Sequence, residues 1–409
     1  MGLTIVQKIL GTKLGHEVKA GQYVFVPVDG AMASDTTAPQ MIRSFQEMGG
    51  RRVWDPSKLS LVLDHASPAP NETVARLHQY IRNFAAEQGA KLYETGSGIC
   101  HHLMIDHGHV KPGDVFIGAD SHTCTYGAIG ALACGVGSTD LAAVALTGTI
   151  WLKVPETIRV NLHGTMRPGV AAKDLMLTIL GRITSSLTSY RAVEFGGDFF
   201  RHSTLAARIP FANMSAELGA KTGIVEGFVG ASLQADADAT YAEVFNFDIS
   251  RIQPQVSLPH APQLSHDVDA LVDTKITMAF LGSCTNTRIE DLRAAAAVVK
   301  GHQVANGVRF YVVPATRAIL LEAIKDGTME ILTEAGATFL PSGCGPCVGT
   351  HLGVPGDDEQ VISAANRNFK GRMGNPKAKV YLASPATVAA SALKGRICNP
   401  QEYLGLNHD

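Results

Sequence analysis

Three cysteines in two separate loops constrain the fold of this chain more than any other feature. Cys344 and Cys347 are separated by Gly-Pro in one loop, and Cys284 follows an apolar run at residues 276–281. Glycine and proline favour a tight, irregular turn that points both sulfurs of the first loop the same way. We expect the apolar run to be a buried strand, so that two strand-end loops bring three thiolates together. Because metal-binding cysteines usually come in fours, such a site would keep one position open to a ligand.

The cysteine spacing alone leaves other interpretations open. A redox Cys-x-x-Cys pair would follow an early strand at a helix start and would not require Cys284. A zinc site of three cysteines and one histidine is a second alternative, because His351 follows Cys347 at a zinc-like spacing. Buried cysteines that bind no metal are the third.

Composition limits the classes of protein to be considered. A length of 409 residues exceeds one ordinary core, so two or three domains are expected. The chain is 45% apolar and 18% charged, and its formal net charge of -2 gives no electrostatic case for binding nucleic acid or an anionic membrane. Seven cysteines without a signal peptide indicate a reducing interior, and no apolar run reaches membrane-spanning length. We expect a cytoplasmic protein.

The order of the predicted elements favours an α/β fold. Strands and helices alternate through the last third of the chain, which implies a parallel sheet with functional loops at its carboxyl edge. Residues 251–267 are rich in proline and glutamine and are our preferred domain boundary. We also expect helices over residues 141–152 and 213–220. The expected domains are residues 1–155, 156–267 and 268–409.

Aspartate and histidine directly follow two of the predicted strands. Asp64-His65 ends an apolar run at residues 59–63, and Asp120-Ser121-His122 ends another at residues 115–119. Open α/β sheets place ligand-binding groups at such strand ends. A carboxylate beside an imidazole can also raise the imidazole pKa towards use as a proton donor. The alternative for an isolated pair is a capped loop with a hydrogen-bonded histidine.

A glycine-containing loop near the C-terminus carries two arginines. Arg367 and Arg372 lie five positions apart, a pattern that suits bidentate capture of a carboxylate or phosphate. Ordinary surface charge is the alternative. The glycine-rich stretch near residue 130 lacks the spacing of a dinucleotide-binding fingerprint, so a Rossmann domain is disfavoured.

Taken together, the motifs resemble the aconitase superfamily of hydro-lyases. Within it they are most similar to the branch that contains the large subunits of 3-isopropylmalate dehydratases and homoaconitases. The matching motifs occur in family order over nearly the whole chain: Leu-Asp-His (63–65), Ala-Asp-Ser-His-Thr (119–123), Gly-Ser-Cys-Thr-Asn (282–286), Gly-Cys-Gly-Pro-Cys (343–347) and Asn-Arg-Asn-Phe-x-Gly-Arg (366–372).

The resemblance implies an aconitase-like fold of three α/β domains around a central iron-sulfur cluster. The cluster would be a four-iron, four-sulfur cluster held by Cys284, Cys344 and Cys347, with one iron open to substrate. The activity implied is removal and re-addition of water on a hydroxy-dicarboxylate. The isomerisation of 2-isopropylmalate and 3-isopropylmalate in leucine biosynthesis is the first expectation. Homoaconitate and small alkylmalates such as methylmalate or dimethylmalate are the alternatives.

The resemblance also implies roles for individual side chains. Asp64 and His65 would protonate the departing hydroxyl, and two further imidazole-carboxylate pairs would surround the iron-bound water. The expected catalytic residues are Asp64, His65, His101, Asp120, His122 and Glu217. The expected substrate-binding residues, including two asparagines near the cluster, are Ser121, Asn213, Asn366, Arg367 and Arg372.

Two departures from the family pattern carry consequences. The swivelling fourth domain, which in the family holds the base serine, is missing from this sequence. A separate small subunit is expected to supply it, in a heterodimer or heterotetramer, so the chain alone is predicted to be inactive. Ser34 stands where single-chain aconitases carry a substrate-binding glutamine. A non-catalytic iron- or RNA-responsive protein and a zinc-bound structural protein are the alternatives from other classes.

Overall fold

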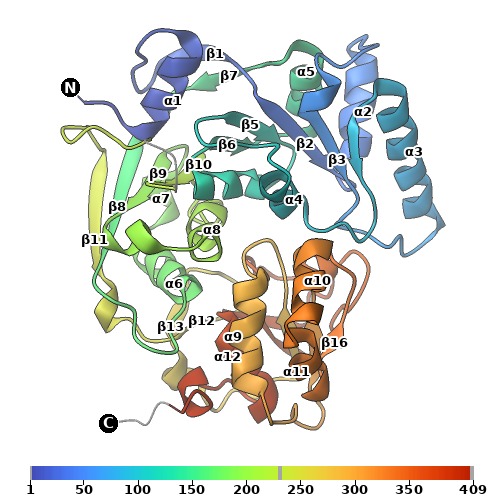
Figure 1. The fold of residues 1–409 in the computed structure, drawn as a ribbon, viewed down its shortest axis with the longest axis vertical. Coiled ribbons are helices and arrows are strands. Elements are labelled where there is room, and N and C mark those ends of the chain that lie inside the picture. Colours follow the sequence, from blue (N-terminus) through green and yellow to red (C-terminus); the bar gives the residue numbers. More distant parts are fainter. Residues whose placement is uncertain (1, 229–232, 406–409) are drawn as a thin grey trace.

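The computed structural model describes residues 2–228 and 233–405. Among these residues the strands form a small antiparallel ribbon and three larger sheets. Figure 1 places the first sheet at the top, the second at the left and the third below, with helices between and around them. The predicted α/β fold with parallel sheets is confirmed. In the part of the chain that the structure describes, no helix combines the length and apolar character needed to cross a bilayer.

The first sheet is parallel throughout and carries Asp64 and Asp120 just beyond its carboxyl edge. In spatial order its strands are β4 (Lys91–Tyr93), β3 (Leu59–Val62), β2 (Gly30–Ser34), β5 (Val115–Gly118) and β6 (Leu132–Gly135). Its helices are α2 (Ala38–Glu47), α3 (Glu72–Gln88), α4 (Cys100–Asp106) and α5 (Ser138–Thr147). Asn71 caps the start of α3, and Gly89 ends that helix with a φ of 72°.

The ribbon replaces part of a predicted helix. Residues 141–152 were expected to be helical, but α5 stops at Thr147 and Gly148 adopts a φ of 70°. The following residues form β7 (Thr149–Lys153), which pairs with β1 (Tyr23–Pro27) beside helix α1 (Ile5–Leu14). Buried and exposed residues alternate along β7, which is the period of a strand and not of a helix.

The second sheet is also parallel and belongs to the middle of the chain. Its order is β10 (Thr222–Val225), β9 (Ala192–Gly196), β8 (Thr157–His163) and β11 (Glu243–Asp248). Its helices are α6 (Ala172–Arg182), α7 (Ser185–Thr188) and α8 (Leu205–Asn213). The helix predicted over residues 213–220 is wrong, because α8 ends where that helix was expected to begin. Glu217 lies instead in a series of turns that closes at Gly219, whose φ is 81°.

The third sheet holds the cysteine loops. Its order is β13 (Ser265–Asp267), β12 (Gln255–Ser257), β18 (Lys379–Ala383), β17 (Gln360–Ser363), β14 (Met278–Leu281), β15 (Arg309–Val312) and β16 (Thr338–Phe339). Its helices are α9 (Ile289–Val299), α10 (Arg317–Lys325), α11 (Thr328–Glu334) and α12 (Pro385–Lys394). The predicted connector at residues 251–267 contributes β12 and β13, which extend this sheet. The domain limits themselves stay predictions.

The carboxyl edges of the first and third sheets face the same region. Asp64 and Asp120 follow β3 and β5, while Cys284 follows β14. Cys284 and Cys344 belong to a hydrophobic core that joins α4 to the third sheet, whereas Cys347 belongs to the core shared with the second sheet. The site therefore lies where the cores meet, on rigid elements from all three sheets.

Candidate active site

A cavity of about 210 Å³ lies between these strand ends. The loops after the strands of the first sheet form one wall, and the cysteine and arginine loops of the third sheet form the other. Most of the residues predicted from the sequence line it, and these are His65, His101, Asp120, Ser121, His122, Cys284, Cys344, Cys347, Arg367 and Arg372. The remaining predicted residues, Asp64, Asn213, Glu217 and Asn366, hydrogen bond to side chains in this lining.

Two of the three cysteine sulfurs accept hydrogen bonds from predicted residues. Cys284 Sγ lies 3.1 Å from Asn213 Nδ2 and 3.2 Å from Asn366 Nδ2. Cys347 Sγ lies 3.5 Å from a terminal guanidinium nitrogen of Arg372. Burial opposes ionisation of Cys347, but the adjacent guanidinium outweighs it and lowers the pKa of that thiol. Donors aimed at sulfur favour the thiolate, which is the form that binds metal. At Cys284, burial and the charge of Cys347 outweigh this effect and raise the pKa of the thiol to about 12.

The spacing of the sulfurs tests what kind of metal centre they fit. Of the described residues, only Asp64, His65 and Cys344 place three ligand atoms within 4.8 Å of one another. A single zinc ion with bonds of about 2.3 Å needs sulfurs about 3.8 Å apart. The three cysteines therefore do not converge on one ion, whereas a cluster spreads its cysteine ligands over several irons.

The zinc alternative loses its fourth ligand as well. Among the described residues, no group of three ligand atoms within 4.8 Å of one another includes His351. Its two ring nitrogens are buried and have no hydrogen-bond partner among the described residues.

His65 is held between two carboxylates. Its Nδ1 lies 2.8 Å from Asp64 Oδ1, and its Nε2 lies 3.4 Å from Asp120 Oδ2. Burial by itself would lower the pKa of His65, but the negative charges of Cys344, Asp64 and Asp120 raise it well above its ordinary value. A buried imidazole that keeps its proton and faces a cavity is suited to act as an acid.

The other two predicted imidazole-carboxylate pairs are also assembled. His101 Nε2 lies 3.1 Å from Asp120 Oδ1, and His122 Nε2 lies 3.0 Å from Glu217 Oε1. Burial opposes the charge on Asp120, but hydrogen bonds from the surrounding histidines hold the pKa of that carboxyl well below its ordinary value. Burial would lower the pKa of His122, but Glu217 raises it. The cavity thus gathers protonatable rings around a carboxylate that stays ionised.

The arginines bring positive charge to the same wall. Arg367 Nε lies 2.6 Å from Glu217 Oε1, and its NH1 group donates to Ser121 Oγ at 2.9 Å. Burial opposes the charge on Arg372, but the cysteine thiolates raise the pKa of this guanidinium. Arg372 Nε is a buried donor without a partner among the described residues. Such a donor beside the cavity suits an anionic ligand.

Comparison with known proteins decides the family. The model of the aconitase family (aconitate hydratase) matches residues 7–227 and 269–395. The chain belongs to the aconitase family. It is 44% identical to 3-isopropylmalate dehydratase large subunit 1 of Methanopyrus kandleri, over 99% of this chain and 100% of that protein. It is 45% identical to 3-isopropylmalate dehydratase large subunit of Moorella thermoacetica, again over 99% of this chain and 100% of the relative.

A solved structure supports the aconitase fold. Aconitase X of Thermococcus kodakaraensis, in its holo form, covers 89% of this chain and 89% of its own with a TM-score of 0.51. Its sequence identity is 13%, so this likeness concerns the fold alone.

Ser34, where the sequence departs from the aconitase-family pattern, does not face the cavity. Ser34 is fully buried, and its hydroxyl lies 2.9 Å from Thr36 Oγ1. Thr36 lines the cavity, whereas Ser34 does not. Val348 and Thr350 also line it without having been predicted. These side chains carry no charge, so no motif based on ionisable residues could have marked them.

Sequence reasoning missed three buried charged or titratable residues near the site. Lys173 on α6 is fully buried and donates to the carbonyl oxygens of Ala364 and Ala365 at 2.8 and 2.6 Å, next to Asn366. Asp35 and His78 contact each other behind His65. Asp35 follows strand β2 directly, as Asp64 follows β3, so its place at a strand end was the signal that could have found it.

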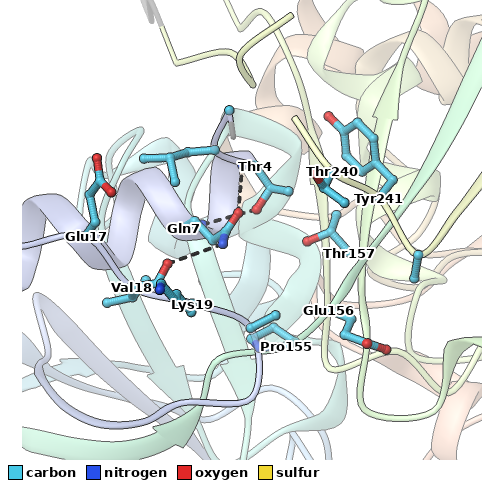
Figure 2. A pocket seen from close by; sticks show the side chains of 14 residues that line it. Thr4, Gln7, Glu17, Val18, Lys19, Pro155, Glu156, Thr157, Thr240 and Tyr241 are labelled. Atoms are coloured by element: carbon cyan, nitrogen blue, oxygen red, sulfur yellow. Dashed lines mark hydrogen bonds between the residues drawn. The ribbon is translucent and has the colours of Figure 1, made fainter. Parts of the chain in front are cut away.

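A second, larger cavity of the aconitase-like fold lies elsewhere. It measures about 630 Å³ and lies between the N-terminal segment, the end of the ribbon and the edge of the second sheet. Figure 2 shows Thr4, Gln7, Thr157 and Tyr241 around it. None of the predicted site residues lines this cavity.

Proposed function

We propose that this chain is the large subunit of a two-chain 3-isopropylmalate dehydratase. The observation that carries the proposal is the 44% identity to a large subunit of that name over its full length. The gathering of thiols, imidazole-carboxylate pairs and arginines around one cavity agrees with it. The small subunit would bring the base serine and further cationic groups that this family requires. We also propose a cytoplasmic location, which agrees with seven free thiols in the described chain.

The cofactor in this proposal is a four-iron, four-sulfur cluster on Cys284, Cys344 and Cys347. When bound, the cluster supplies a Lewis-acidic iron with an open position. Among the described residues the three sulfurs do not all lie within 4.8 Å of one another, which supports a cluster over a single ion.

Substrate binding would rest on the arginine loop. The two carboxylates of the substrate would enter the cavity, where the wall formed by the third sheet carries Arg367 and Arg372. Ser121 adds a hydroxyl beside Arg367. Arg372 Nε is free to donate, so the guanidinium can hold a carboxylate through two parallel hydrogen bonds. This contact fixes the substrate relative to His65 and lowers the entropic cost of reaction.

Dehydration breaks one C–O bond and one C–H bond of the substrate. The base of the small subunit takes the proton from carbon, and the electron pair forms the alkene as the hydroxyl leaves. We assign His65 to donate its proton to that hydroxyl, so that water is the leaving group. Asp64 orients the His65 ring, while the other pairs, His101 with Asp120 and His122 with Glu217, hold the released water and its protons. Addition of water to the other alkene carbon reverses these steps.

An anaerobic reconstitution tests the proposal. The chain would be purified anaerobically, analysed for iron and acid-labile sulfide, and assayed alone and with a small subunit co-expressed from the same genome. We expect a brown protein with near-equal iron and sulfide, inactive alone, that converts 3-isopropylmalate when paired. Preference for homoaconitate or an alkylmalate would replace the substrate assignment. A colourless protein with stoichiometric zinc that iron and sulfide do not change would overturn the whole proposal.

A further inference from the structure

The carboxylate of Asp35 binds the turn that carries the proposed acid. Its Oδ1 accepts the backbone N–H of His65 at 2.9 Å and that of Asp64 at 3.3 Å. Its Oδ2 accepts the backbone N–H of Ala66 at 2.8 Å. One buried side chain at the end of β2 therefore satisfies consecutive backbone donors at the end of β3. A carboxylate with several such donors is held firmly in its ionised form.

His78 completes this arrangement from the other side. Its ring lies on α3, is 2% exposed, and places Nε2 at 3.2 Å from Asp35 Oδ2. Burial opposes the charge on Asp35, but the hydrogen bond from His78 and the nearby His65 keep the pKa of that carboxyl below its ordinary value. Neither Asp35 nor His78 lines the cavity, so neither can touch the substrate.

The turn at residues 64–66 is a junction between the two halves of the site. Asp64 Oδ2 accepts the backbone N–H of Cys100 at the start of α4, at 2.8 Å. The carbonyl oxygen of Asp64 accepts the backbone N–H of Cys344 at 2.8 Å, and that of His65 accepts the hydroxyl of Thr350 at 2.9 Å. Movement of this turn would displace the ring of His65 and its contact with the cysteine loop together.

We propose that Asp35 and His78 form a positioning pair that fixes the 64–66 turn and, through it, the aim of the His65 ring at the substrate hydroxyl. The inference rests on the proposed function for what His65 does. The inference goes beyond the proposed function by assigning a role to two residues outside the cavity.

The pair can be tested with substitutions that keep shape and change hydrogen bonding. Asp35→Asn retains the size of the side chain but replaces one acceptor oxygen with an NH₂ group, which cannot accept a hydrogen bond from the backbone N–H groups. We expect kcat of the reconstituted enzyme to fall about 100-fold, because misplacing a catalytic group by about 1 Å costs that much. KM should stay within about twofold, since the arginine loop is not attached to this turn.

Substitutions at the second residue give an internal rescue. His78→Phe keeps a ring but removes the donor, and kcat should fall about tenfold, the value of one lost hydrogen bond. His78→Gln places an amide NH₂ near the position of Nε2 and should recover most of that loss. Phe84→Leu is the matched control, because Phe84 is a buried residue of the same helix whose ring packs edge-on against Phe45. It should destabilise the chain without changing kcat.

Hydrogen exchange separates this proposal from the proposed function. In the large subunit with its small subunit, the amides of residues 64–66 should exchange about tenfold faster in Asp35→Asn and His78→Phe than in wild type. Phe84→Leu should leave them unchanged. If the wild-type large and small subunits together convert none of the candidate substrates, the proposed function fails. The exchange experiment still tests the positioning role of Asp35 and His78. Unchanged exchange, a kcat for Asp35→Asn within twofold of wild type, or an equal kcat loss in Phe84→Leu would overturn the positioning role.

Discussion

Two cavities of the described residues differ in the side chains that face them as well as in volume. The larger, near the N-terminus, measures about 630 Å³, and its charged residues Glu17, Lys19 and Glu156 are exposed at its rim. The smaller measures about 210 Å³, and its ionisable groups are buried and bonded to one another. At the smaller cavity, neighbouring groups outweigh burial, raising the pKa of His65 and lowering that of Asp120. Buried, mutually bonded ionisable groups therefore mark a site better than volume does.

The smaller cavity is also the one whose assembly carries an energetic cost. A buried charge is destabilising unless it is paired, and removing one partner leaves the other charge buried and unpaired. Substitutions should therefore have larger effects the more of this paired network they remove, and the smallest effects in the region of the larger cavity.

The largest effect is expected for Cys347→Ser. The serine hydroxyl is a poor ligand for iron, and the thiolate it replaces is the one that Arg372 stabilises. Iron, sulfide and visible absorbance should fall to trace levels, and the paired enzyme should be inactive. Iron analysis beside an absorbance spectrum measures this. Retention of both at wild-type levels would show that this cysteine is not a ligand.

A large effect on turnover alone is expected for His65→Asn. The asparagine amide can keep the hydrogen bond to Asp64 but cannot donate a proton as an acid. We expect kcat to fall about 100- to 10,000-fold with little change in KM, as for loss of a general acid. Steady-state kinetics of the reconstituted pair check this, with cluster absorbance as the control. A variant with normal kcat would remove His65 from the proton-transfer step.

A smaller effect is expected for Arg372→Lys. Lysine keeps the charge but loses the planar fork, including the unpartnered Nε. We expect kcat/KM to fall about 10- to 100-fold, the value of a lost charge-assisted hydrogen bond. Because Arg372 also contacts Cys347, iron content must be measured on the same samples. Unaltered kinetics would contradict the carboxylate clamp.

The residues that the sequence placed at strand ends share a local signal. Asp64, Asp120 and Cys284 each follow a short apolar run closely, and in the structure each follows a strand of a parallel sheet. Asp64 and Asp120 follow strands of one parallel sheet, so local position was enough to predict that they meet at its carboxyl edge. Cys284 follows a strand of another sheet, and its place beside them was expected from the family resemblance alone. Their roles in chemistry remain assignments from the family resemblance.

What the sequence did not reveal depends on partners far along the chain. Asp35 was missed because the strand before it was not predicted, and nothing local shows that its carboxylate faces the backbone of residues 64–66. Glu217 was placed on a helix over residues 213–220, but in the structure helix α8 ends at Asn213 and Glu217 lies in the turns that follow it. Asn213 bonds Thr125, Thr285 and Cys284, so tertiary contacts govern this segment more than its helix propensity.

Beside the larger cavity, a buried carboxyl should affect stability and not turnover. Glu194 accepts the backbone N–H of Ile5 at 2.6 Å and the hydroxyl of Tyr241 at 3.1 Å. Burial raises the pKa of Glu194 to about 7. The unfolded chain releases this proton near pH 4.3. Between about pH 4.3 and about pH 7 the native state therefore binds more protons than the unfolded state. Stability from this group is present below about pH 4.3 and is lost as pH rises to about 7.

Glu194→Gln removes this dependence because glutamine does not ionise. The difference in thermal midpoint between pH 5 and pH 8 should be smaller in the variant than in wild type, on the order of a few degrees. The exposed substitution Asp198→Asn is the control and should leave that difference as it is. An equal pH dependence in Glu194→Gln and wild type would show that Glu194 is ionised throughout the folded state.

The smallest effect is expected for Thr157→Val in the larger cavity. The Thr157 hydroxyl is 3% exposed and has no hydrogen-bond partner among the described residues. Valine has nearly the same shape, so the substitution removes a buried unsatisfied group and should stabilise the chain by about 1 kcal/mol. Because none of the predicted site residues lines this cavity, kcat and KM should stay within about twofold of wild type. A larger kinetic change would mean that the two cavities are coupled, and the contrast between them would then concern regulation as well as chemistry.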